Sequence, residues 1–107
     1  MAWIYLGIAG LFEIVWVVFM KKSAGFSLLV PSLVTIGAMI VSFALLSTAM
    51  KTLPLGTAYA VWTGIGAAGA FVLGVALFGE AVTAMRVIAC ALIVAGIVLM
   101  KLSTPNP

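Results

Sequence analysis

The chain has 107 residues, of which 66% are hydrophobic and 7% are charged, and its formal net charge is +3. Soluble domains carry roughly a quarter charged residues, and a chain this short has too small an interior to bury so much apolar surface. The composition therefore excludes an ordinary soluble domain and predicts an integral membrane protein. The five basic residues are scattered among the expected helix ends, which does not suggest nucleic-acid binding.

Four apolar stretches are long enough to cross a bilayer as helices, which takes roughly 17 to 25 residues each. In chain order they cover about residues 3–20, 28–50, 55–78 and 85–102, with short polar links between them. A β-barrel would instead show segments of about ten residues with alternating polarity. We therefore expect an all-α protein with a single four-helix transmembrane domain over residues 1–107.

The first stretch has no basic segment before it and no small-residue cleavage site after it, and it contains an acid. These features favour an uncleaved first helix over a signal peptide. Elsewhere the sequence has no histidine, one cysteine (Cys90), and two acids far apart. It also shows no phosphate-binding glycine loop and no nucleophile–base pair. We therefore expect a protein that is not an enzyme, with no catalytic residue, no metal site and no cofactor.

Basic residues are almost evenly divided between the two sides of the membrane that four spans define. Lys21, Lys22 and Arg86 lie on one side, and Lys51 and Lys101 lie on the other with the terminal amine. Cytoplasmic loops normally carry a clear excess of basic residues. Two interpretations stay open at this point: insertion in both orientations with pairing as an antiparallel dimer, or a fixed topology set by another feature.

Glu13 lies about ten residues into the first stretch, or about 15 Å of helical rise, close to the middle of the membrane. An acid there is disfavoured by about 2.5–3.5 kcal/mol, so we predict a functional site at Glu13. The alternative is a protonated acid that makes one structural interhelical hydrogen bond. A carboxyl group can hold a proton, or release it and hold a cation, which is the minimal machinery of a proton–cation antiporter. Glu80, beside Gly79 in a polar link, is expected to be solvated.

Gly10 and Trp16 share the face of Glu13, at i−3 and i+3. Gly10 leaves room beside the acid, and Trp16 offers an indole N–H donor and an aromatic face.

Ser42 of the second stretch, and Tyr59 and Trp62 of the third, lie at similar depth by helical rise. Donors and aromatic faces around one acid suit a flat, hydrogen-bonding cation such as guanidinium. The alternatives are that the aromatic residues belong to an interfacial belt and that Ser42 bonds back to its own helix.

Small residues mark two further features. Gly64 and Gly66 in the third stretch predict a bend, close helix packing, or both. Ala89 and Gly96, seven residues apart in the fourth stretch, predict a helix–helix seam. This seam is either a dimer contact or an intramolecular one.

The four spans, Glu13 and the run Leu53–Gly64 (LPLGTAYAVWTG) resemble the small multidrug resistance family over essentially the whole chain. Trp16 stands where the drug-exporting branch usually has glycine, so the resemblance is closest to the guanidinium exporter subtype. It implies an antiparallel homodimer of dual-topology subunits in which the two Glu13 carboxylates share one site. The site would be lined by Gly10, Trp16, Ser42, Tyr59 and Trp62, with a helix bend at Gly64 and Gly66 and a dimer contact at Ala89 and Gly96. The family often has glycine at the position of Ala89, which makes that contact the weakest part of the comparison.

The resemblance implies proton-coupled export of guanidinium and small guanidinyl cations across the bacterial cytoplasmic (inner) membrane, without a cofactor. One rival is a polyspecific exporter of quaternary ammonium compounds from the same family. Rivals of other classes are a non-transporting accessory membrane subunit and a channel.

Overall fold

The structure of the chain is a computed structural model, and it describes residues 1–104. Its four helices are α1 (Ala2–Lys22), α2 (Leu29–Ala49), α3 (Leu55–Phe78) and α4 (Ala84–Ser103). All four are long and apolar enough to cross a membrane, and residues 1–104 contain no strand. This confirms the prediction of an all-α, multi-pass membrane protein. The helix ends differ from the expected ranges by at most two residues, and residues 105–107 of the predicted domain lie outside the described part.

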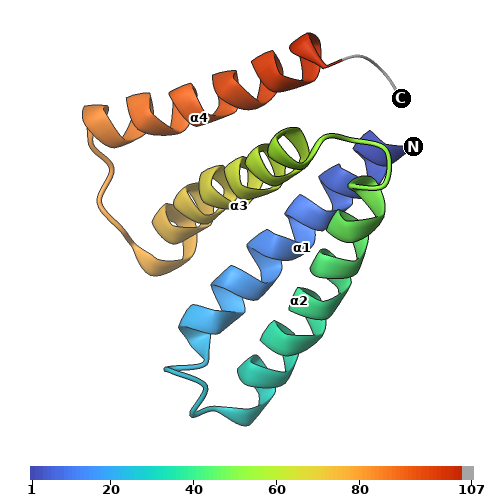
Figure 1. The fold of residues 1–107 in the computed structure, drawn as a ribbon. Coiled ribbons are helices and arrows are strands. Elements are labelled where there is room, and N and C mark those ends of the chain that lie inside the picture. The colour runs from blue at the N-terminus through green and yellow to red at the C-terminus, as the bar shows by residue number, and fades with distance from the viewer. Residues whose placement is uncertain (105–107) are drawn as a thin grey trace.

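Helices α1, α2 and α3 form a bundle in which α1 packs against both of the others (Figure 1). Helix α4 runs beside α3 and, over residues 1–104, packs closely against no other helix. No residue of α4 is buried within one protomer. The sides of this helix that do not face α3 are thus available to lipid or to a second protein.

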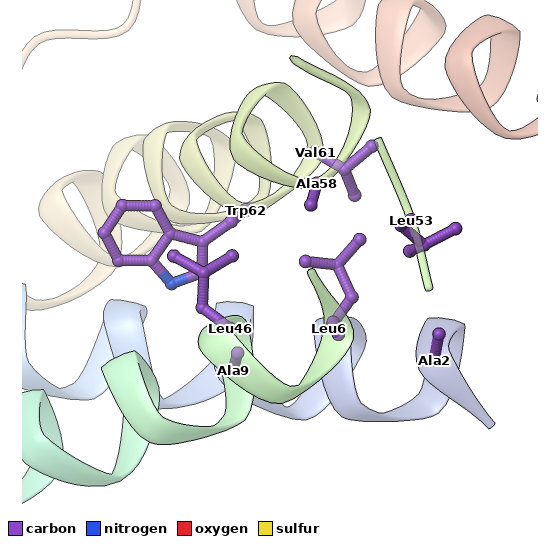
Figure 2. Packing of buried hydrophobic residues seen from close by; sticks show 9 residues of the cluster. Ala2, Leu6, Ala9, Leu46, Leu53, Ala58, Val61 and Trp62 are labelled. Atoms are coloured by element: carbon purple, nitrogen blue, oxygen red, sulfur yellow. The ribbon is translucent and has the colours of Figure 1, made fainter. Parts of the chain in front are cut away.

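The buried core lies between α1, α2 and α3, toward the end where α1 begins (Figure 2). Leu6 is fully buried at its centre, and Ala9 and Ala58 are fully buried where the backbones approach. Lipid is as apolar as these side chains, so helices associate through close packing, which small residues permit. The core thereby fixes the positions of α1 and α3, which carry most of the predicted site.

The link between α1 and α2 is a tight reversal in the left-handed region. Ala24, Gly25 and Phe26 have φ angles of 51°, 74° and 64°. The buried Ser23 hydroxyl donates to the Met20 carbonyl at 2.6 Å and accepts from the Phe26 backbone N–H at 3.0 Å. These bonds hold two non-glycine residues in a conformation that L-amino acids disfavour.

Candidate functional site

Glu13 is buried, with 8% of its surface exposed, and its carboxyl group lies directly against the backbone of Gly66 on α3. A methyl group on Gly66 would overlap the carboxyl carbon and an oxygen. Gly10, one turn earlier on α1, is packed against Ile65 in the same way, since a methyl group there would lie 2.6 Å from its Cγ2 atom. Gly66 therefore creates the room in which the acid sits, and Gly10 lets α3 approach α1 closely through Ile65. Within residues 1–104, Glu13 Oε1 has no hydrogen-bond partner.

Ser42 ties three helices together through one fully buried hydroxyl group. It donates to the backbone carbonyl of Ala9 on α1 at 2.7 Å and accepts from the indole Nε1–H of Trp62 on α3 at 2.9 Å. The alternative that Ser42 bonds back to its own helix is therefore wrong. Because its single proton is donated to Ala9, Ser42 does not donate to Glu13 in this conformation. Its role here is to hold the ring of Trp62 in place.

Four aromatic rings form a continuous row across the same three helices. Trp16 meets Phe43 edge-on at 6.3 Å between centroids, Phe43 meets Trp62 at 5.7 Å, and Trp62 meets Tyr59 at 5.8 Å. The Trp16 Nε1 atom is buried and, within residues 1–104, has no acceptor. Phe43 was not among the predicted site residues, although its position next to Ser42 placed it at the right depth.

The structure places the remaining predicted residues on α3 and α4. Helix α3 is continuous through Gly64 and Gly66, and a methyl group on Gly64 would lie 2.9 Å from the Ile97 side chain of α4. Ala89 and Gly96 are exposed on α4, and a methyl group on Gly96 would meet no atom within 4 Å. The close packing of Gly64 is therefore seen directly, whereas the helix bend and the dimer contact stay predictions.

The second acid, Glu80, lies in a different environment from Glu13. It is exposed and forms an ion pair with Lys21 at 3.9 Å. No group of three or more histidine, cysteine or acidic residues that could hold a metal occurs in the part of the chain that the structure describes.

The chain matches the family described as Small Multidrug Resistance protein over residues 1–93. It is 61% identical to the guanidinium exporter of Escherichia coli strain K12 over 97% of this chain and 99% of that protein. Guanidinium exporters of Citrobacter freundii and Salmonella typhimurium are each 59% identical with the same coverage. These names describe exporters and not enzymes, in agreement with the expectation that the chain has no enzymatic activity. The resemblance found in the sequence is thus confirmed, and the chain belongs to the small multidrug resistance family.

Proposed function

We propose that this protein is a proton-coupled exporter of guanidinium and small guanidinyl cations in the bacterial inner membrane. The observation that carries the proposal is the Glu13 carboxyl, buried in a membrane-spanning helix with an oxygen that has no partner within residues 1–104. The names of relatives that are 61% and 59% identical support the choice of substrate.

The geometry around Glu13 suits a small planar cation. A guanidinium ion can direct two parallel N–H groups at one carboxylate, and its flat face can lie on an aromatic ring. Trp62 is held by its hydrogen bond to Ser42 and braced by Phe43 and Tyr59. A quaternary ammonium ion could also lie on an aromatic ring, but it has no N–H donors and would lose the paired hydrogen bonds to the carboxylate.

A second copy of the chain would complete the site. Glu13 Oε1 and Trp16 Nε1 are buried without partners within residues 1–104, and α4 buries no residue. Buried polar groups are normally paired, and the more so in a membrane. Three basic residues on one side and two on the other do not favour one orientation, so we propose that the chain inserts both ways and pairs as an antiparallel homodimer. Its two Glu13 carboxylates would meet near the midplane.

Such a dimer could expose its binding site to each side of the membrane in turn without adopting a second fold. In an antiparallel pair the two subunits adopt inequivalent conformations, and exchanging them produces the same structure turned over in the membrane. Rocking around a midplane site is a common transporter pattern. The Glu13 pair would release a cation when protons bind and release protons when a cation binds, which couples the two movements in opposite directions.

The test is electrical current from purified protein in liposomes on a solid-supported membrane. Guanidinium would be compared with tetrapropylammonium for the wild type, for Glu13→Gln and for Glu80→Gln. We expect guanidinium current in the wild type and in Glu80→Gln, the control for the loss of an acid, and none in Glu13→Gln.

Each other outcome would indicate a different function for this protein. Current from tetrapropylammonium alone would assign the chain to the drug-exporting branch. Guanidinium flux without any coupled proton movement would indicate a channel. The absence of current with either cation would indicate an accessory subunit.

A further inference from the structure

A lateral crevice of about 270 Å³ opens between α1, α3 and α4, at the end of the molecule where α1 begins and α4 ends. Its walls include Trp3 and Gly7 of α1, Val61 of α3 and Ile97 of α4, and its one charged residue is Lys101. Glu13 does not line it. The crevice is therefore distinct from the pocket of the Glu13 carboxyl, and its walls belong to helices that are apolar enough to span a membrane.

Lys101 is fixed at the mouth of the crevice. It is exposed in the last turn of α4, and its Nζ atom lies 4.9 Å from the centroid of the Trp3 ring. The contact with Trp3 leaves the ammonium N–H groups that point away from the ring available to a ligand. Glu13 lies in mid-span and Glu80 pairs with Lys21, so no side-chain carboxylate neutralises Lys101 within residues 1–104.

The wall that carries Lys101 is anchored at the same end. The hydroxyl groups of Thr57, at the start of α3, and Thr104, just beyond α4, lie 3.4 Å apart, and Thr104 also donates to the Met100 carbonyl at 2.7 Å. These bonds hold the end of α4 beside the start of α3. The end of α4 is thus in contact with α3 through Thr104 and with α1 through Lys101, next to the mouth of the crevice.

We propose that this crevice binds an anionic phospholipid, with the phosphate on Lys101 and part of one acyl chain along the apolar walls. A cation at headgroup depth above an apolar groove matches the amphiphilic shape of a lipid. Pockets for whole drug-sized molecules have volumes of about 300–1,000 Å³, so this crevice takes a segment of a chain and not a whole lipid. The proposal does not depend on the transported substrate.

The test is native mass spectrometry of the purified, assembled protein with phosphatidylglycerol and with phosphatidylcholine of the same acyl chains. Lys101→Gln removes the charge, and its control is Lys51→Gln, an exposed lysine at the same end of the molecule. Gly7→Leu fills the crevice, because a side chain on Gly7 starts in open space. Its control is Gly37→Leu, an equally unobstructed position on α2.

We expect the wild type to prefer phosphatidylglycerol by roughly fivefold, as one lysine near anionic lipid predicts. Lys101→Gln should abolish that preference, and Gly7→Leu should weaken binding of both lipids, while the two controls behave as the wild type. Inorganic phosphate at millimolar concentration should not displace the lipid, because it cannot use the apolar walls. Equal effects of Lys101→Gln and Lys51→Gln would overturn the proposal in favour of general interfacial attraction. Unchanged binding in Gly7→Leu would show that the crevice is not occupied.

Discussion

At the scale of single residues, the site depends on where side chains are missing as much as on where they are present. The Glu13 carboxyl occupies the space that Gly66 leaves, and Ile65 occupies the space that Gly10 leaves. Gly66, predicted as a bend residue, is thus also the surface against which the acid rests. We predict that this contact sets the direction in which the carboxyl group points.

Gly66→Ala is predicted to impair transport while leaving the fold intact. The added methyl group would overlap the carboxyl of Glu13, which is the free end of a flexible side chain and can swing away. Misplacing a binding group by about 1 Å lowers rates by up to about a hundredfold, so we expect guanidinium current to fall at least tenfold. Gly56→Ala, on the same helix with open space around it, is the control. Wild-type current in Gly66→Ala would show that the contact does not orient the acid.

Ser42→Ala is predicted to lower the stability of the protein, because it leaves a buried hydrogen-bond donor without an acceptor. The buried Nε1–H of Trp62 would lose its acceptor, a change worth about 1–3 kcal/mol in thermal unfolding of the detergent-solubilised protein. Ser103→Ala, which removes only an exposed bond to the Met100 carbonyl, should have little effect. The double variant Ser42→Ala/Trp62→Phe should lose less than the sum of the single losses, by about 1 kcal/mol. Strict additivity would mean that the bond contributes nothing.

At the scale of elements, the link between α1 and α2 holds its shape against the preference of its residues. A non-glycine residue in the left-handed region is disfavoured by about 1–2 kcal/mol, and Ala24 and Phe26 are both there. Ala24→Gly should therefore stabilise the protein by about 0.5–1 kcal/mol after the greater backbone entropy of glycine is subtracted. Ala44→Gly, on an exposed face inside α2, should instead destabilise it by a similar amount. Destabilisation in both would rule out the left-handed link in solution.

The helices themselves could be predicted from the sequence because each is an unbroken apolar run bounded by polar or glycine-rich links. The face that each helix turns toward the others could not be predicted, because a helix that is apolar almost all round has no periodic hydrophobic face. Glu13, Gly10 and Trp16 could be grouped from the sequence because they share one face of one helix. The contact of Glu13 with Gly66 and the insertion of Phe43 between two tryptophans needed the packing of different helices.

At the scale of the whole molecule, the exposed α4 offers a surface for the proposed partner subunit. Gly96 has open space around it, so Gly96→Leu should leave the protomer fold unchanged and disturb only a partner packed on α4. We expect size-exclusion chromatography with light scattering to show a shift from dimer toward monomer, and guanidinium current to fall with it. Gly37→Leu, equally open but on α2, should remain dimeric. A dimeric Gly96→Leu would place the interface elsewhere.

The proposed competition between protons and substrate would make the transport cycle measurable as a pH dependence of binding. If guanidinium binds only to the deprotonated Glu13 pair, its affinity must fall as pH is lowered through the titration of that pair and must level off above it. Linkage sets the slope, which is about tenfold in Kd per pH unit for each proton displaced. A limiting slope of one decade would mean one proton exchanged per guanidinium, and two decades would mean that both carboxylates release a proton. Isothermal titration calorimetry in buffers of different ionisation enthalpy counts the same protons independently.

Glu80→Gln should keep the full dependence, because Glu80 is exposed beside Lys21 and takes no part in the exchange. Binding that is independent of pH over the whole range would rule out the proposed proton–cation coupling, because a site that holds cation and proton together cannot drive one against the other.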